Sequence, residues 1–364
     1  MKIPIAYWIS SHGFGHASRA SALMEELELQ KPQTFHFHIF TSLPSWFFDI
    51  HHYSFTHHRV EVDPGIVQKS TLEEDLEATL NMARQWSSPK QVVHLLPVLK
   101  KKGISFIIAD IAPLAFWAAG ELGIPSLLVE SFTWDWIYQG YVSKDPAFDT
   151  LIEPYRRLFS IADYHIQTEP LGMRKEGVPL VGPISRRARK SPLIIHHELG
   201  VPKDTKMILL SLSGKPKNFD FWDQLEEWKE FFFVFASLEA PKEIRQGNRL
   251  LLARETPFFH PDLVQASHGV IGKAGYSSVA EVYEFQKPFL FVTRPMLQET
   301  ACLVRFLQNS HPSKEIPKEG FYEGAWLEQL SFFITEHAFP ERLISGREEG
   351  AKEILKIFQK EKIL

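Results

Sequence analysis

Two histidines in a glycine-rich stretch are the first residues of the chain whose types suggest chemistry. His12 and His16 lie in the sequence SHGFGHASR, directly after an apolar run over residues 3–10. A histidine changes charge near neutral pH, so at the end of a first strand it can take a proton from a hydroxyl nucleophile. A helix cap is the alternative role, and the residues alone leave both roles open for each histidine.

A carboxylate occupies a comparable place further along the chain. Asp110 ends the apolar run of residues 104–109, which predicts a buried strand. At a strand end beside the first loop, this carboxylate can orient a histidine base in the way that a catalytic triad does. It is equally well placed to cap the helix that begins near Pro113, and this second role stays open.

A glycine turn in the second half of the chain suggests an anion site. Residues 270–271 are apolar, Gly272 and Gly275 follow, and residues 276–285 have apolar side chains at helical spacing. This pattern predicts a strand, a turn and a helix start. The free N–H groups of a helix start bind anions, and Lys273 reinforces that charge, so a phosphate is the predicted ligand. An ordinary strand-to-helix turn without a ligand is the alternative.

Glu281 follows about one and a half turns into this predicted helix. Its two acceptor oxygens suit the vicinal hydroxyls of a ribose. After an apolar strand over residues 289–292, Gln298 and Glu299 open another helix. The stretch therefore predicts a site for a nucleotide.

The elements that must position these residues alternate between strands and helices. This alternation predicts an α/β protein with two parallel, doubly wound sheets, which bind ligands at the carboxyl ends of their strands. Residues 185–204 are rich in Pro, Gly and basic side chains and predict a linker. We therefore expect an N-terminal domain over residues 1–184, the linker over 185–204, a C-terminal domain over 205–340 and a terminal helix over 341–364.

Composition narrows the class of protein. The 364 residues are 44% hydrophobic and 23% charged, which is globular, and the net charge of -4 does not favour nucleic acid as a partner. Cys302 is the single cysteine, so no intrachain disulfide is expected. No run reaches transmembrane length and no signal-peptide pattern is present, so we expect a cytoplasmic protein, with peripheral membrane contact left open. The histidines of residues 36–58 lack metal-ligand spacing, so no metal is expected.

Taken together, these motifs resemble GT-B glycosyltransferases, especially the MurG-like and UDP-glycosyltransferase branch. Residues 11–19 and 110–138 are also similar to the glycosyltransferase-like N-terminal region of plant L-arabinokinases. The resemblance implies the GT-B fold, with two Rossmann-like domains facing a cleft. Since the chain ends without the kinase region of those proteins, sugar phosphorylation is not expected.

The resemblance also implies roles for individual residues. His16 corresponds to the catalytic histidine, Asp110 to the aspartate that orients it, and Glu281 to the glutamate that holds the ribose, with His12 as a further catalytic candidate. The implied donor-binding residues are Gly214, Lys215, Gly272, Lys273, Gly275, Tyr276, Ser277, Ser278, Glu281, Gln298 and Glu299. The implied acceptor-binding residues are Gly13, Phe14, Gly15, Trp134 and Trp136, although the tryptophans suit a hydrophobic core as well.

The function that the resemblance implies is transfer of a sugar, of the hexosyltransferase type, from a nucleotide sugar to an acceptor hydroxyl. UDP-sugar is the expected donor, and neither a metal nor a separate cofactor is expected. A nucleotide-sugar epimerase or hydrolase on the same scaffold, and a non-catalytic nucleotide-sugar-binding protein, stay open. Lys273 to Tyr276 departs from the His-Cys-Gly-Trp sequence of plant secondary-metabolite transferases, so donor recognition is expected to differ from theirs.

Overall fold

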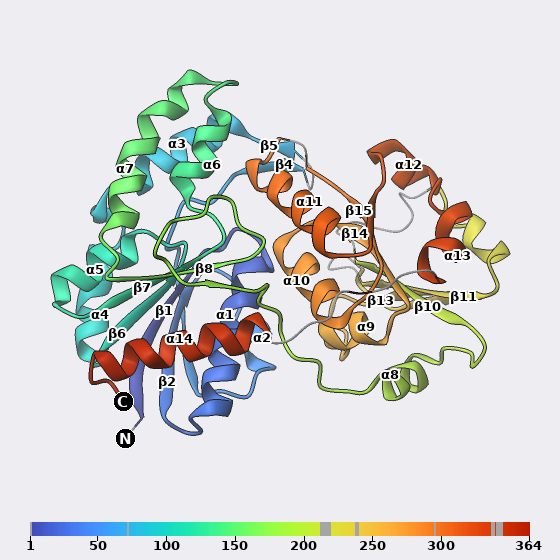
Figure 1. Cartoon of the computed structure of the whole chain (residues 1–364), viewed down its shortest axis with the longest axis horizontal. Coiled ribbons are helices and arrows are strands. Elements are labelled where there is room, and N and C mark those ends of the chain that lie inside the picture. The colour runs from blue at the N-terminus through green and yellow to red at the C-terminus, as the bar shows by residue number, and fades with distance from the viewer. Residues whose placement is uncertain are drawn as a thin grey trace. The chain divides into compact units, whose positions relative to one another are not determined.

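The computed structural model describes residues 2–70, 73–211, 220–236, 240–294, 296–335, 339 and 345–364. The chain forms two compact units (Figure 1). Unit 1 comprises Met1–Arg186, Met296–Cys302 and Leu343–Leu364, and unit 2 comprises Arg187–Pro295 and Leu303–Arg342. The first boundary between the units thus lies between Arg186 and Arg187.

Unit 1 is built on a seven-stranded parallel sheet in the order β3-β2-β1-β6-β7-β8-β9. Its strands are β1 (Ile3–Ile9), β2 (Phe35–Thr41), β3 (Phe55–Arg59), β6 (Phe106–Asp110), β7 (Ser126–Glu130), β8 (Tyr164–Thr168) and β9 (Leu180–Val181). The central strands are nearly continuous apolar runs because helices cover both faces of the sheet. β1 pairs with β6 so that Ile9 lies opposite Asp110. The loop after β1 therefore begins beside Asp110.

The helices of unit 1 form two layers around this sheet. They are α1 (Phe14–Gln30), α2 (Trp46–Asp49), α3 (Leu76–Trp86), α4 (Leu96–Lys101), α5 (Leu114–Leu122), α6 (Trp134–Tyr141), α7 (Asp149–Ser160) and α14 (Gly346–Lys360), with 3-10 turns at Pro89–Gln91, Val93–Leu95 and Pro146–Phe148 and a small hairpin of β4 (Gln68–Ser70) and β5 (Glu73–Glu74). The last helix, α14, packs beside α1, as Figure 1 shows. Phe358 of α14 contacts Phe35 and Phe106 at ring-centroid distances of 5.4 and 5.0 Å. The end of the chain is thus part of the core of unit 1.

Unit 2 repeats the same plan with the strand order β12-β13-β11-β10-β14-β15-β16, in which β12 alone is antiparallel among the described strands. Its strands are β10 (Lys206–Ser211), β11 (Phe231–Ala236), β12 (Ile244–Gln246), β13 (Arg249–Leu252), β14 (Gly269–Lys273), β15 (Phe289–Val292) and β16 (Ser313–Glu315). Its helices are α8 (Pro192–Leu199), α9 (His260–Ala266), α10 (Tyr276–Phe285), α12 (Lys318–Glu323) and α13 (Leu327–Thr335), with a 3-10 turn at Gln224–Glu227; α11 (Gln298–Ser310) begins in unit 1 and continues into unit 2. Two doubly wound sheets confirm the fold class expected from the alternation of elements.

The stretch that was expected to be a linker contains a helix of unit 2. Pro192 occupies the first turn of α8, and Gly200 ends the helix at a φ of 63°. Ile195 and Leu199 lie in the core of unit 2. The proline and glycine that indicated a linker are therefore the start and stop signals of a helix, and residues 187–204 belong to unit 2.

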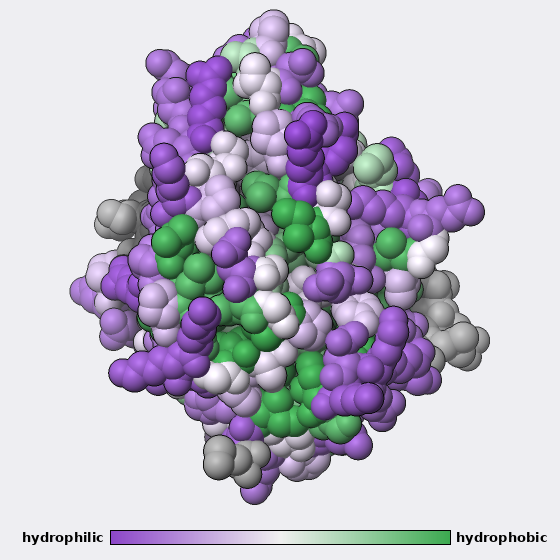
Figure 2. All heavy atoms as spheres, turned by 90° about the vertical axis from the view of Figure 1, so that its left-hand side faces the viewer, coloured by the Kyte–Doolittle hydropathy of each residue, from purple (hydrophilic) through white to green (hydrophobic). Residues whose placement is uncertain are grey.

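One face of the molecule is of mixed polarity. On the face shown in Figure 2, hydrophobic residues form patches that hydrophilic residues interrupt. Within the described part of the chain, no helix combines the length and the apolar character needed to cross a membrane.

Candidate functional site

The start of α1 is set by a glycine that the backbone requires. Gly13 has a φ of 75°, a region that side chains disfavour, and precedes the first helical residue, Phe14. Phe14 stacks on Phe47 at 5.1 Å, which fixes the entry of the helix. Gly15 lies half-buried in the first turn. His16 is thus placed one turn into α1, close to the carboxyl end of β1.

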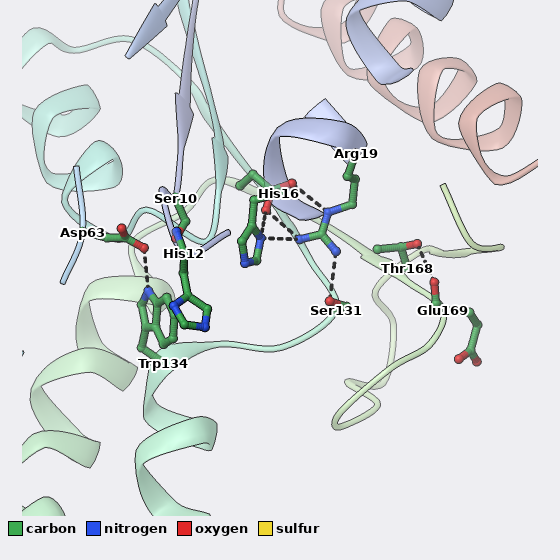
Figure 3. Close-up of polar contacts among 10 residues, drawn as sticks. Ser10, His12, His16, Arg19, Asp63, Ser131, Trp134, Thr168 and Glu169 are labelled. Atoms are coloured by element: carbon green, nitrogen blue, oxygen red, sulfur yellow. Dashed lines mark hydrogen bonds and ion pairs between the residues drawn. The ribbon is translucent and has the colours of Figure 1, made fainter. Parts of the chain in front are cut away.

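His16, Asp110 and Arg19 form one buried cluster (Figure 3). His16 Nδ1 lies 2.7 Å from Asp110 Oδ1. Arg19 donates from Nε to Oδ2 at 2.7 Å and from Nη2 to Oδ1 at 2.6 Å, so its guanidinium holds both oxygens of the carboxylate. Arg19 Nη1 also donates to Ser131 Oγ at 2.9 Å. All four side chains lie in or beside the loops at the carboxyl ends of β1, β6 and β7.

The partners of His16 determine which ring nitrogen carries the proton. Because an ionised carboxylate only accepts hydrogen bonds, the 2.7 Å contact requires that Nδ1–H donates to Asp110. The neutral imidazole then has a lone pair on Nε2, which makes no hydrogen bond to any described residue. In Figure 3 this nitrogen points away from Arg19. The geometry is that of a histidine base held by a carboxylate.

The charge of Asp110 is maintained by its neighbours. Complete burial acts to raise the pKa of Asp110, but the charge and hydrogen bonds of Arg19, joined by those of His16, outweigh burial and lower the pKa below its usual value. Sequence reasoning did not assign a role to Arg19. The signal was present, because residues three apart lie on one face of a helix and Arg19 follows His16 at that spacing.

A second buried carboxylate near His16 was also missed. Asp63, in the loop after β3, accepts a hydrogen bond from Trp134 Nε1 at 2.9 Å. Burial raises the pKa of Asp63 to about 6, against hydrogen bonds from Ser10 and Trp134 and the nearby His16 charge, which lower it. No spacing rule links residue 63 to residue 16, so the sequence offered no signal for this neighbour.

His12 is oriented differently from His16. The backbone N–H of Ile66 donates to His12 Nδ1 at 3.2 Å, so in the neutral ring Nε2 carries the proton. Its ring meets Trp134 edge-on at 5.8 Å. Trp134 is fully buried, so its ring packs against protein, whereas the expectation of a stacking contact with a sugar needs an exposed face. Trp136 is half-buried and lies against Gly172.

The two glycines of the turn in unit 2 differ in what the fold requires. A Cβ on Gly272 would lie 2.6 Å from the carbonyl oxygen of Ser211, so the pairing of β14 with β10 excludes any side chain there. Gly275, the N-cap of α10, has an extended φ of -133°, and a Cβ there would meet only Lys273 Cε at 3.9 Å. The protein itself does not require a glycine at position 275, and the start of α10 has no side-chain cap.

The first turn of α10 carries Tyr276, Ser277 and Ser278, whose N–H groups precede the first helical hydrogen bond, from Val279 N–H to the Gly275 carbonyl. Lys273 ends β14 and is partly exposed. These residues bring a helix start and a cation together at one end of the sheet, which suits an anion.

Glu281 lies inside unit 2, only 1% exposed, at the end of a chain of hydrogen bonds. Its Oε2 is 2.7 Å from His260 Nδ1, and His260 Nε2 is 2.8 Å from Ser211 Oγ. Neither Ser211 nor His260 was singled out in the sequence. Ser211 ends β10 and His260 begins α9, so the fold, rather than any motif, brings them to Glu281.

The remaining candidates for donor binding belong to other segments of the chain. Gln298 and Glu299 begin α11 within the segment Met296–Cys302 of unit 1. The Gln298 amide occupies the space next to Gly140, where a Cβ would lie 2.1 Å from Oε1. Gly214 and Lys215 lie outside the described residues. Among the residues that are described, no three His, Cys, Asp or Glu side chains gather into a metal-binding group.

Comparison with known sequences gives one match of moderate identity. No family model matches the chain. The L-arabinokinase of Arabidopsis thaliana is 27% identical over 360 residues, which cover 95% of this chain and 33% of that protein. The chain thus spans about a third of the length of the curated relative that it matches.

Comparison with solved structures establishes the fold. A UDP-glucosyltransferase from Polygonum tinctorium capable of glucosylating indoxyl aligns with a TM-score of 0.60 over 99% of this chain and 94% of that one, at 14% identity. The calicheamicin glycosyltransferase aligns with a TM-score of 0.62 over 99% of both chains, also at 14% identity. Phytolacca americana UGT2, complexed with UDP-2-fluoro-glucose and pterostilbene, aligns with a TM-score of 0.58 over 98% of this chain and 94% of that one, at 14% identity. The chain therefore has the GT-B fold of these glycosyltransferases, as the resemblance implied.

Proposed function

We propose that the chain is a glycosyltransferase of the hexosyltransferase type, which moves a sugar from a nucleotide sugar, and from a UDP-sugar in particular, to an acceptor hydroxyl. The observation that supports this most directly is the His16–Asp110 pair. In it the carboxylate is 2.7 Å from Nδ1 and the lone pair of Nε2 has no partner among the described residues. A GT-B fold with such a histidine is suited to deprotonating a hydroxyl.

The acceptor half of the reaction uses unit 1. The acceptor hydroxyl donates its proton to His16 Nε2, and Asp110 stabilises the imidazolium that forms. Arg19 keeps Asp110 ionised and fixes its orientation through two hydrogen bonds. The deprotonated oxygen then attacks the anomeric carbon through an oxocarbenium-like transition state, while the bond to the diphosphate breaks. In this scheme Gly13, Phe14, Gly15 and Trp136 line the acceptor, and His12 donates a hydrogen bond through Nε2–H rather than acting as a base.

The donor half uses unit 2. We assign the ribose hydroxyls to Glu281 and the diphosphate to the start of α10, where the N–H groups of residues 276–278 precede the first helical hydrogen bond, no side chain caps the helix, and Lys273 adds a positive charge. The fixed dipole of the helix and the ammonium group stabilise the charge of the leaving diphosphate, so we propose a reaction that does not depend on a metal ion or a separate cofactor. Gln298, Glu299, Gly214 and Lys215 remain proposed contacts of the donor sugar and the diphosphate.

A thermal-shift panel of nucleoside diphosphates and nucleotide sugars tests the donor site. Ligand at about a hundredfold excess over its dissociation constant stabilises the folded state by about 2.7 kcal/mol, which raises the melting temperature. We expect stabilisation by UDP and a UDP-sugar, lost in Glu281→Ala and retained in His16→Ala. A flat panel for the wild-type chain would overturn the proposed donor site.

Product analysis separates transfer from its alternatives. Incubation with a bound nucleotide sugar and an acceptor library should give a glycosylated acceptor in the wild type and none in His16→Ala. Free or isomerised sugar without an acceptor would instead indicate a hydrolase or an epimerase. Binding without any turnover across the library would indicate a nucleotide-sugar-binding protein.

A further inference from the structure

In the chain of hydrogen bonds Ser211–His260–Glu281, the histidine lies between the hydroxyl of Ser211 and the carboxylate of Glu281. Both distances are short, 2.8 Å from Ser211 Oγ to Nε2 and 2.7 Å from Nδ1 to Glu281 Oε2. The Glu281 side chain is 2% exposed, whereas that of His260 is 30% exposed. The carboxylate is thus largely covered by protein, whereas the imidazole is in contact with solvent.

The direction of each hydrogen bond follows from the chemistry of the three groups. The carboxylate only accepts, so His260 Nδ1–H donates to Glu281. In the neutral imidazole Nε2 has a lone pair and accepts a hydrogen bond from the Ser211 hydroxyl. Ser211 then presents only oxygen lone pairs to a ligand, and the three groups together carry one negative charge. An anion beside Ser211 is disfavoured in this state.

Binding of one proton to His260 reverses the direction of the hydrogen bond between His260 and Ser211. When His260 is protonated at Nε2, Nε2–H donates to Ser211 Oγ, and the serine hydroxyl is released to donate outward. The imidazolium and the carboxylate now cancel in charge. Ser211 has thereby changed from a hydrogen-bond acceptor to a donor, which is the property that a phosphate oxygen requires.

Ser211 lies where a diphosphate is proposed to bind. β10 and β14 are neighbours, and Ser211 is paired with Gly272, just before the turn that leads into α10. Both residues lie at the carboxyl ends of parallel strands, the end at which open α/β sheets bind ligands. The relay thus ends beside the start of α10 and connects it with the proposed ribose contact.

We infer that His260 is a positioning residue that couples proton uptake to the binding of a nucleoside diphosphate, by switching Ser211 into a hydrogen-bond donor while holding Glu281 in place. The inference rests on the proposed donor site in unit 2. It assigns to His260 a role in holding and releasing the diphosphate product, which carries more negative charge than the nucleotide sugar from which it is formed.

The other ionisable groups on the elements packed against α9 are engaged elsewhere or lie outside the relay. Asp262 of α9 accepts hydrogen bonds from the backbone of Arg189 and Lys190, and His196 of α8 is bonded to the Ala266 carbonyl. Arg189 stacks over Phe259, and Lys190 pairs with Glu198 of α8. The remaining ionisable groups on these elements and on the neighbouring β14 are His197, Tyr276, Tyr283, Glu284, Lys206 and Lys273.

Calorimetric titration of UDP at about pH 6 and about pH 8, the range in which histidines change charge, tests the coupling. The terminal phosphate of UDP also gains a proton near pH 6, so each variant is compared with the wild type under the same conditions. We expect the affinity of the wild type to rise on acidification by roughly tenfold more than that of His260→Gln, which is the effect of one charge-assisted hydrogen bond. Buffers of different ionisation heat should show proton uptake by the wild type beyond that of His260→Gln.

Two further variants make the result specific. Ser211→Ala removes the switching hydroxyl and should give the same reduced pH dependence as His260→Gln, even if His260→Gln were to fold poorly. His197→Gln removes an exposed histidine of unit 2 and should behave as the wild type. Equal pH dependence in the wild type and in both relay variants would overturn the inference while leaving the donor site intact. Failure of UDP to bind the wild type at either pH would overturn the donor site and the inference with it.

Discussion

Each unit holds a histidine against a buried carboxylate at 2.7 Å, yet the two pairs differ in what the second ring nitrogen faces. In unit 1, His16 Nε2 has no hydrogen-bond partner among the described residues, and Arg19 donates hydrogen bonds to both oxygens of the Asp110 carboxylate. In unit 2, His260 Nε2 is bonded to Ser211. The same pair of side chains thus leaves the second ring nitrogen without a hydrogen bond to a described residue in one unit and hydrogen-bonded to a serine in the other.

The difference shows that a histidine–carboxylate pair does not by itself determine what the histidine does. The carboxylate fixes which nitrogen carries the proton, and the group at the other nitrogen decides whether that proton can be exchanged with a ligand. His12 supplies a third case, because the Ile66 N–H occupies its Nδ1 and leaves Nε2–H as a donor. Replacement of each of these three histidines by Gln is therefore expected to have a different effect.

The largest expected effect separates His16 from His12. His16→Gln removes the open lone pair, so transfer to an acceptor should fall by roughly 10²- to 10⁴-fold, the usual contribution of a general base. His12→Gln should cost no more than about tenfold, since loss of one neutral hydrogen-bond donor is a smaller change. Initial rates at saturating donor measure both. Equal losses in the two variants would show that the open nitrogen has no special role.

The next effect tests the arginine that distinguishes the first pair. Asp110→Ala leaves Arg19 buried without its carboxylate, which should reduce the free energy of unfolding by about 3 to 5 kcal/mol. The double variant Asp110→Leu with Arg19→Met should recover much of this loss, because neither charge then remains. Urea unfolding gives the values. The exposed Glu153–Arg157 pair is the control, and Glu153→Gln should have little effect.

A smaller effect concerns the second carboxylate near His16 and has a defined pH dependence. Because the pKa of Asp63 is raised from 3.8 to about 6 on folding, folding favours its protonated form. Stability from this group is present below pH 4 and is lost as the pH rises through about 6. Asp63→Asn removes the titration, so the stability of the variant relative to wild type should improve by about 2 to 3 kcal/mol between pH 4 and pH 8. A constant difference in unfolding free energy across this range would contradict the raised pKa.

The smallest effects separate the two glycines in unit 2. Gly272→Ala places a Cβ against the Ser211 carbonyl and should destabilise the chain by about 1 to 3 kcal/mol. The Cβ of Gly275→Ala makes only an ordinary contact with Lys273 Cε at 3.9 Å, so the variant should change stability by less than about 1 kcal/mol, while weakening the binding of UDP by covering the start of α10. Melting temperature and UDP affinity, measured on both variants, resolve the two roles. Unchanged UDP affinity in Gly275→Ala would remove the diphosphate from this helix start.

The sequence predicted the fold well because its signals are local. The apolar runs became strands of two doubly wound sheets, and the strand-end positions of His16 and Asp110 correctly placed them side by side, since β1 and β6 are neighbours. The helix α8 was not predicted, because Pro192 and Gly200 are typical of a linker as well as of the start and end of a helix. Local patterns thus predicted the apolar strands, whereas a proline and a glycine that suit two kinds of segment did not reveal α8.

The site was only partly predictable because its remaining members have no local signal. Asp63 lies in a loop, 71 residues before its partner Trp134, and Ser211 lies at a strand end, 49 residues before its partner His260. No sequence rule links residues at these separations, and the fold brings them together. Arg19 is the exception, since its helical spacing from His16 could have indicated the contact. The fold therefore supplies the contacts that distinguish the two histidine–carboxylate pairs.

The return of α14 to unit 1 has a consequence for how the protein forms during synthesis. Phe358 contacts Phe35 and Phe106, and Glu349 accepts the Gly182 N–H at 2.8 Å, so the part of unit 1 that is made first lacks part of its core until α14 has been synthesised. Domains generally fold in the order in which they are made. Here the residues of unit 2 are all made before α14, so unit 2 can complete its core first, whereas the core of unit 1 lacks the side chains of α14 until that helix is made. A chain synthesised only as far as residue 345 therefore exposes apolar side chains of unit 1 that α14 buries in the complete fold.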